Sequence, residues 1–289
     1  MATACSAGLD TGFAALDVGK MIVLGVVQGV TELLPISSTA HMRVVPALLG
    51  WPDPGSAFSA LMQLAALGAI LSYFRRDVAE LISAAASVVV RRDLKSPGSR
   101  AVIGIVLATA PIVVAGVALA PVLNACGSPL RSLWVIGASC LVMAALLAFA
   151  EIRARHVRNA DEATLRDYAL VGLAQVGALI PGVSRSGSTL TAALGLGFKR
   201  AEAARLSFLI GLPAIALAGG KEAFELLRAG LDAHAWMLLF VGLISGALAS
   251  FVAIWGLMRY LEHLPSWPFV VYRGALGVFL VGAVLFHWL

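Results

Sequence analysis

Charged side chains are scarce in this 289-residue chain. They make up 13% of it, whereas hydrophobic residues make up 60%, and the mean hydropathy is +0.92. Because a water-soluble domain carries roughly 25% charged residues, the composition excludes an ordinary soluble globular protein. The sequence therefore predicts an integral membrane protein.

Cysteine is also nearly absent. Cys5, Cys126 and Cys140 are an odd number and lie far apart, which excludes a disulfide framework and a cysteine-based metal site. We predict that they are small apolar packing residues. The net charge is only +5 and the basic residues are divided among short segments beside apolar runs, so nucleic acid is not an expected partner.

Apolar runs of nearly the length that a membrane-spanning helix needs, roughly 20 residues, occur six times. They cover 58–74, 101–121, 132–150, 203–219, 236–258 and 270–288.

Two further apolar stretches, 19–50 and 168–198, are broken near their middle by Pro35 and by Pro181-Gly182. Each half is too short to cross, because a limb over 37–50 would rise only about 20 Å against a hydrocarbon core of about 30 Å. We therefore predict two re-entrant helical hairpins, a form tolerated only where the broken backbone lines a protein-walled cavity.

The basic residues indicate an orientation. They concentrate in three segments that would face one side of the membrane, 75–100, 153–166 and 199–200. The segments that would face the other side carry few basic residues, chiefly Lys20, Arg131, Lys221 and Arg228. By the positive-inside rule the rich side is cytoplasmic. We therefore expect both termini outside the cytoplasm and, because three spans separate the hairpins, hairpin tips that meet near the bilayer midplane.

The predicted fold class follows. It is an all-α polytopic membrane protein with six transmembrane helices and two re-entrant helical hairpins in an inverted-topology repeat. Residues 1–289 would form one membrane domain, with repeats at 19–150 and 168–288. Similarity between the two tips is slight, since LLPISST and LIPGVSRS share an apolar pair, a proline and serines.

The polar residues of the two tips point to phosphate chemistry. Serines and threonines after each proline are good N-caps, so each second limb directs its positive helix end at the meeting point. Two such ends and Arg185 suit an anion, most plausibly phosphate. Glu32 and His41 suggest proton transfer or metal-assisted hydrolysis, since a carboxylate beside an anion is repulsive unless a proton or metal ion mediates.

Two motifs carry a resemblance to a known family. QGVTELLPISSTAH, residues 28–41, resembles the first signature of the undecaprenyl-diphosphatase family, the BacA-type undecaprenyl pyrophosphate phosphatases: Glu or Gln, three residues, Glu, then Pro-x-Ser-Ser-Thr and His. PGVSRSGST, 181–189, looks like the second signature. The similarity extends along nearly the whole chain, including QLAALGAILSYFRRD and SFLIGLPAIALAG.

The resemblance implies an enzyme of the bacterial plasma (inner) membrane. Such enzymes remove the terminal phosphate of undecaprenyl diphosphate, which recycles the lipid carrier of peptidoglycan synthesis and gives bacitracin resistance. A divalent cation, Mg²⁺ or Ca²⁺, is implied as cofactor, with Glu32 as a candidate ligand, and the active site is expected near the midplane, opening outward. The sequence does not indicate an oligomeric state.

Residue roles carry over by position. Glu32, Ser38, His41 and Arg185 would be catalytic, with Ser38 as the nucleophile. Gln28 stands where many members have Glu, and because glutamine cannot act as a base, any mechanism that needs two carboxylates from this motif is in doubt. The candidate substrate-binding residues are Gln28, Ser37, Thr39, Ser184, Ser186 and Thr189.

Each of these residues also has an alternative, purely structural explanation. Glu32 could be a structural acid paired with an arginine, and His41 could only hydrogen-bond a helix. N-capping is the favoured reading for Ser37 and Thr39, while Ser186 could only satisfy the turn backbone.

Two mechanisms fit the residues. Either Ser38 attacks the terminal phosphorus while Glu32 or His41 takes its proton, or water attacks directly and Ser38 only binds. A third, less favoured option is His41 as a phosphorylated nucleophile. The competing class of function is a membrane transporter or flippase for an anionic or polyprenyl-phosphate substrate, because paired hairpins in an inverted repeat are also a transporter architecture.

Overall fold

The structure is a computed structural model that describes residues 5–6, 9–123, 129–286 and 288. A small antiparallel ladder pairs β1 (Cys5–Ser6) with β2 (Leu9–Asp10). The other regular elements in the described part of the chain are eleven α-helices and four short 3-10 helices. Cys126 lies outside the described residues, whereas Cys140 is buried as a free thiol in the helix packing.

Six helices are long and apolar enough to cross a membrane, as the sequence predicts. The predicted all-α fold with six spans is therefore confirmed. The second-half helices α9 and α10 extend well beyond the expected apolar runs, and Lys221 pairs with Glu225 at 2.6 Å on the polar end of α9. The six are α3 (Ser56–Tyr73), α5 (Pro97–Leu123), α6 (Leu133–Arg153), α9 (Arg200–Arg228), α10 (Ala233–His263) and α11 (Trp267–Leu285).

Two pairs of short helices take the places of the predicted hairpins. The first is α1 (Val18–Leu33) with α2 (Ser38–Leu48), and the second is α7 (Leu165–Val176) with α8 (Arg185–Gly195). The longest has 16 residues, which is about 24 Å and less than the roughly 30 Å of a hydrocarbon core. The breaks fall at the predicted prolines, and the lengths agree with hairpins that enter the membrane and return.

Helix α4 (Arg75–Arg91) is an element that the sequence reading left as part of a connector. It follows α3 with only Phe74 between them, and none of its residues is fully buried. Its mixture of arginines and apolar residues is too polar for a span but repeats at a helical period.

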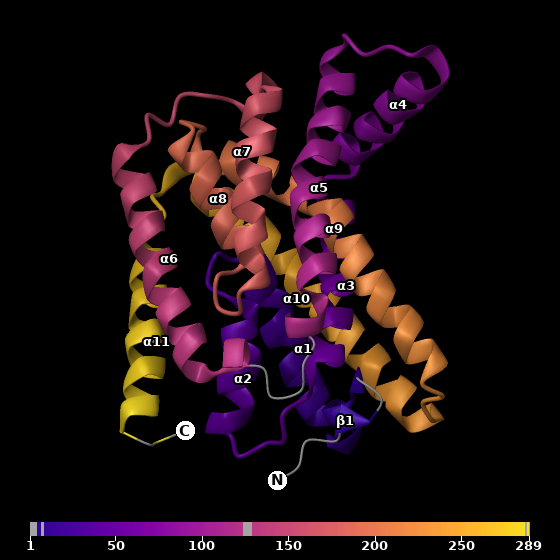
Figure 1. The fold of residues 1–289 in the computed structure, drawn as a ribbon, viewed down its shortest axis with the longest axis vertical. Helices are drawn as coiled ribbons and strands as arrows, with labels where there is room; N and C mark the ends of the chain where they lie inside the picture. The colour runs from indigo at the N-terminus through magenta and orange to yellow at the C-terminus, as the bar shows by residue number, and fades with distance from the viewer. Residues whose placement is uncertain (1–4, 7–8, 124–128, 287, 289) are drawn as a thin grey trace.

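The two halves of the chain pack reciprocally. The first limb of each hairpin lies against the middle span of the other half, α1 against α10 and α7 against α5. Helix α3 also packs on α9, and α6 on α11 at the left of Figure 1. This exchange agrees with an inverted-topology repeat, while the exact boundaries 19–150 and 168–288 stay predictions.

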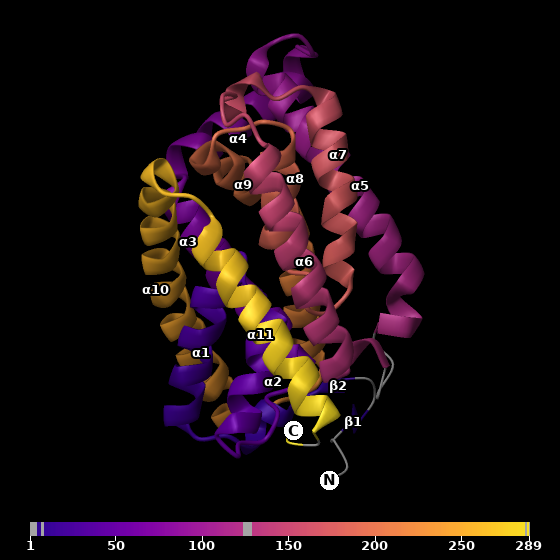
Figure 2. The ribbon, with the colours of Figure 1, turned by 90° about the vertical axis from the view of Figure 1, so that its left-hand side faces the viewer.

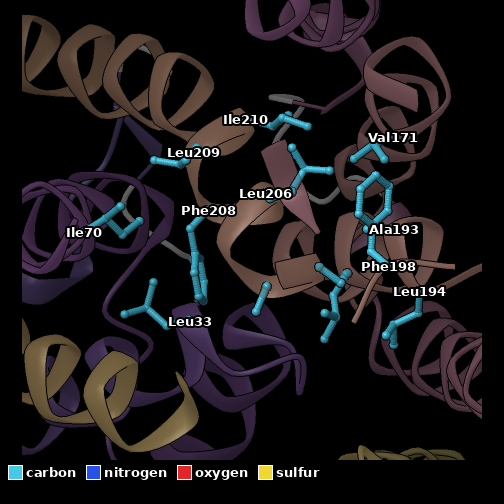
Figure 3. Close-up of a cluster of buried hydrophobic side chains, with 14 of the residues drawn as sticks. Leu33, Ile70, Val171, Ala193, Leu194, Phe198, Leu206, Phe208, Leu209 and Ile210 are labelled. Carbon is cyan, nitrogen blue, oxygen red and sulfur yellow. The ribbon is translucent and has the colours of Figure 1, made fainter. Parts of the chain in front are cut away.

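A buried apolar cluster anchors both hairpins to the spans (Figure 3). It joins Leu33 of α1, Val171 of α7 and Leu194 of α8 to Ile70 of α3 and Phe208 of α9. Lipid tails are as apolar as these side chains, so close packing rather than escape from water stabilises such contacts. Three of the four hairpin limbs, α1, α7 and α8, therefore share one apolar core with the spans.

The three basic connectors meet at one end of the bundle. Arg205 donates to Asp77 of α4 at 2.7 Å and to Asp161 of the α6–α7 connector at 3.1 Å, and Lys199 donates to Asn159 at 2.8 Å. The β ladder and the end of α11 lie at the opposite end in both views (Figures 1 and 2). The chain thus separates its basic connectors from its first and last elements, as the positive-inside pattern predicts.

Helices α1 and α10 approach closely because glycines face each other. A Cβ atom at Gly25 would lie 2.1 Å from Ser245 Oγ and 2.6 Å from the carbonyl oxygen of Gly242, and one at Gly29 would lie 2.3 Å from that of Gly246. Both helices carry these glycines four residues apart, the small-residue spacing that brings membrane helices together.

We expect Gly25→Val to destabilise the fold by about 1–3 kcal/mol, since the added side chain must push α10 away. Thermal unfolding of the detergent-solubilised protein measures the effect. Gly256→Val is the matched control, because nothing lies within 4 Å of a Cβ at Gly256 on α10. Equal losses in the two variants would contradict the close-packing explanation.

Candidate functional site

The tips of the two hairpins touch. Ser186 Oγ donates to the carbonyl oxygens of Glu32 at 3.1 Å and Leu34 at 3.2 Å, and Arg185 Nη2 lies 3.5 Å from Glu32 Oε1. Arg185 and Glu32 are 153 residues apart in sequence. The structure therefore brings both sequence motifs to one place.

The same local device begins the second limb of each hairpin. Ser37 and Ser184 are the N-caps of α2 and α8, accepting from the backbone N–H groups of Ala40 at 3.4 Å and Gly187 at 3.2 Å. Both serines have positive φ, 75° and 68°, which is uncommon for residues other than glycine and often marks functional sites. The free N–H groups of both first turns are held at the junction, where an anion would gain from two helix ends.

Glu32 is the centre of the hydrogen bonds at this junction. Its Oε2 accepts from Ser38 Oγ at 2.7 Å and from Gln28 Nε2 at 2.9 Å. The side chain is only 7% exposed. A serine hydroxyl whose proton points at a buried carboxylate is arranged for deprotonation by that carboxylate.

Arg185 supplies the positive charge of the site. Its side chain is 10% exposed, and its Nη1 is buried with no hydrogen-bond partner among the described residues. Buried donors without acceptors are rare, so this N–H group marks a position for an acceptor such as a phosphate oxygen. Gly211 of α9 makes room for the guanidinium, because a Cβ there would lie 1.9 Å from Nη1.

A cavity of about 360 Å³ reaches the junction. Gln28, Ser38 and Thr39 form part of its wall, and charged residues from α2, from the connecting segments and from the outer part of α9 form another part. The charged residues are Arg43, Asp53, Arg131, Lys221, Glu222 and Glu225.

The chain is similar to known proteins along most of its length. Residues 21–279 match the family model described as "Bacitracin resistance protein BacA". The chain belongs to the BacA family.

Curated members of the BacA family are similar over nearly their full length. "Undecaprenyl-diphosphatase 2" of Mesorhizobium japonicum is 66% identical over 262 residues, 91% of this chain and 99% of the relative. The undecaprenyl-diphosphatases of Gloeobacter violaceus and Synechococcus elongatus are 47% and 46% identical, each over more than 90% of both chains.

His41 is at the site but does not bond to Ser38. Its Nδ1 lies 2.7 Å from the carbonyl oxygen of Ser37 and its Nε2 lies 2.6 Å from the hydroxyl of Tyr272. A carbonyl only accepts, so Nδ1 donates to it, and Nε2 shares a hydrogen bond with the Tyr272 hydroxyl. Glu32 is therefore the group in contact with the Ser38 hydroxyl, and a catalytic role for His41 stays a prediction.

The remaining predicted binding residues divide into two groups. Thr39 is exposed on the cavity wall, whereas Thr189 is fully buried behind Arg185, to whose carbonyl oxygen it donates at 2.8 Å. Ser37, Ser184 and Ser186 bond to the backbone of the tips, as the structural reading of Ser37 and Ser186 expects. Direct substrate contact by these five residues stays a prediction.

Arg273 of α11 is a site residue that the sequence reading missed. It is 1% exposed, and its guanidinium donates to the carbonyl oxygens of Pro35 at 3.1 Å, Gly182 at 2.6 Å and Val183. One side chain thus holds both tips. The signal in the sequence was a single arginine within the apolar run 270–288, because ionisable residues at such depth are costly and usually functional.

We expect Arg273→Met to lower the free energy of unfolding by about 3 kcal/mol, since buried carbonyls at both tips lose their donor. Thermal unfolding measures the loss, and backbone hydrogen exchange should rise at 34–37 and 180–184. Arg259→Met, at an exposed arginine of α10, is the control. Unchanged exchange at both tips would show that Arg273 does not hold them.

Proposed function

We propose that this protein hydrolyses undecaprenyl diphosphate to undecaprenyl phosphate and inorganic phosphate. The observation that carries the proposal is the Ser38 hydroxyl, 2.7 Å from Glu32, beside an arginine with a free buried donor. The relatives are named for undecaprenyl diphosphate, and the six spans place the protein in the membrane where such a lipid resides. The reaction would recycle the lipid carrier for peptidoglycan synthesis and give bacitracin resistance.

The first chemical step follows from the contacts at the tips. Arg185 and the N-terminal turns of α2 and α8 bind the terminal phosphate and stabilise its developing charge. Ser38 Oγ attacks the terminal phosphorus and passes its proton to Glu32. The bridging P–O bond breaks, and undecaprenyl phosphate leaves.

Water completes the reaction. It attacks the phosphoserine at Ser38, the Ser38 oxygen recovers the proton from Glu32, and both protons of the water leave with inorganic phosphate, released as H₂PO₄⁻. The hydrogen bond between Ser38 and Glu32 favours this route over direct attack by water, in which Ser38 would need no base.

A divalent cation, Mg²⁺ or Ca²⁺, fits the donor set of the junction. The described residues contain no group of three or more His, Cys, Asp or Glu that could hold a metal ion by itself. Gln28 Oε1, however, is a buried oxygen without a hydrogen-bond partner in the described part of the chain, and Glu32 is adjacent. These are the hard oxygen donors that such cations prefer, so Gln28 and Glu32 would bind the ion with substrate oxygens and water, and the ion would neutralise phosphate charge.

The residues that line the cavity indicate the side of the membrane to which the site opens. Arg131 and Lys221, on its wall, belong to the side of the chain that is poor in basic residues, and the basic connectors lie at the other end. By the positive-inside rule the cavity then opens to the outside of the bacterial plasma membrane, with both termini on that side. Diphosphate released outside the cell would reach Ser38 without crossing the bilayer.

The test is phosphate release from undecaprenyl diphosphate by the purified protein in detergent. We expect release of one phosphate per lipid, loss of activity with a chelator and recovery on addition of Mg²⁺ or Ca²⁺. Because micelles offer no second compartment, hydrolysis in detergent cannot be explained by transport. An intact, folded protein that releases no phosphate with either cation would refute the proposal.

In that assay Ser38→Ala and Glu32→Gln should each lower turnover by about a hundredfold or more. The double variant should lose little more than either single variant, because residues that act as one unit are not additive. Ser59→Ala, on the same cavity wall, is the matched control and should remain active. Losses that multiply in the double variant would show that the two side chains act separately.

Gly211→Ala should lower turnover by about tenfold or more, because its methyl group displaces the Arg185 guanidinium and small misplacements in a site are costly. Gly220→Ala on the same helix is the control, since a Cβ there has nothing within 4 Å. The comparison is made on turnover at matched folded fraction. Equal activities would mean that the position of Arg185 is not critical.

A further inference from the structure

Helix α4 is tied to the membrane boundary at both ends. Only Phe74 separates its start at Arg75 from the end of span α3 at Tyr73, and residues 92–96 join it to span α5. Helix α5 has 27 residues, about 40 Å, so only about 10 Å of it extends beyond a core of about 30 Å. Figure 1 shows α4 splayed outward from the bundle beside the upper part of α5.

One face of α4 packs on α5, and none of the described residues covers the opposite face. A Cβ at Gly98 of α5 would lie 2.9 Å from the Cβ of Ala84, which places Ala84 on the packed face. The opposite face is a stripe of apolar residues at helical spacing, in which Ile82, Val89 and Val90 are 66%, 78% and 80% exposed. The α4 stripe consists of Ala79, Ile82, Ala86, Val89 and Val90.

Basic residues flank the α4 stripe at both ends. Arg75 and Arg76 precede it, and Arg91, Arg92 and Lys95 follow it, all exposed. Positive charges in the first turn oppose the helix dipole, so Arg75 and Arg76 do not stabilise the helix. Of the three acidic residues in 75–95, Asp77 is neutralised by Arg205 at 2.7 Å.

We propose that α4 is an interfacial helix that lies on the anionic leaflet beside the basic connectors. The α4 stripe enters the boundary between headgroups and acyl chains, and the flanking arginines bind lipid phosphates. An apolar face bounded by basic residues matches an apolar layer under an anionic layer, and each basic residue near such a surface contributes about 1 kcal/mol. A second copy of the chain would need an acidic complement, and the α4 stripe has basic ends on every copy.

The depth of single labels on α4 tests the proposal. The full chain, with Cys5, Cys126 and Cys140 replaced by alanine, carries one fluorescent label at Ile82→Cys, at Val89→Cys or at Glu80→Cys. Glu80 is exposed on a different face of the same helix and is the matched control. Each variant is placed, one protein per nanodisc, in zwitterionic lipid or in lipid with about 30% phosphatidylglycerol.

We expect lipids with brominated acyl chains to quench the labels at 82 and 89 but not the label at 80. Quenching of the labels at 82 and 89 by aqueous iodide should be about threefold or more weaker than at 80, most clearly in the anionic discs. Arg91→Glu with Arg92→Glu should restore iodide access at Val89→Cys, whereas Arg91→Lys with Arg92→Lys should not.

Three outcomes would overturn the proposal. Equal iodide access at 80, 82 and 89 in both lipids would place the α4 stripe in water. The labels could also be protected from iodide equally with and without anionic lipid, and regardless of the charge reversal. That result would show that the arginines have no role in the binding. The labels could be protected from iodide only when two copies share a nanodisc, and not be quenched by brominated lipid. That result would show that a second copy of the chain covers the α4 stripe.

Discussion

Inside a membrane, a broken helix must satisfy its backbone polar groups within the protein, and the site depends on this constraint. Both hairpins break at a proline, which leaves carbonyl groups of the two tips without helical partners. Arg273 donates to carbonyls of both tips, and Ser186 of the second tip donates to carbonyls of the first. Each tip is therefore completed by groups from elsewhere, which fixes the two halves against each other.

The proposed catalytic arrangement is a consequence of that contact. Once the tips touch, Glu32 lies between the hydroxyl of Ser38 and the guanidinium of Arg185. The carboxylate offsets the charge of the buried arginine in the free protein and accepts the serine proton in the proposed reaction. A buried ion pair by itself adds little stability, so the pair is better explained by its place beside Ser38 than by folding.

The two hairpins share a scaffold but differ in chemistry. Gly25 and Gln28 in α1 have counterparts in Gly172 and Gln175 of α7, with the same spacing and the same close approach to a span of the other half. Ser38 and Arg185 are both the first residue of a second limb, directly after a serine cap. The proposed nucleophile and the phosphate ligand thus occupy equivalent positions, and Glu32 has only Leu179 at the matching position.

The sequence alone determined the six spans, the two broken hairpins and the two motifs, because long apolar runs and prolines act locally and show directly in the order of residues. It did not reveal α4, whose mixed composition resembles a connector, or the roles of Arg273 and Gly211. Nor could it choose Glu32 over His41 as the partner of Ser38. Apart from α4, these depended on which side chains meet in the folded chain, from Ser38 and Glu32, 6 residues apart, to Arg273 and Pro35, 238 residues apart. Only the tertiary packing decides such contacts.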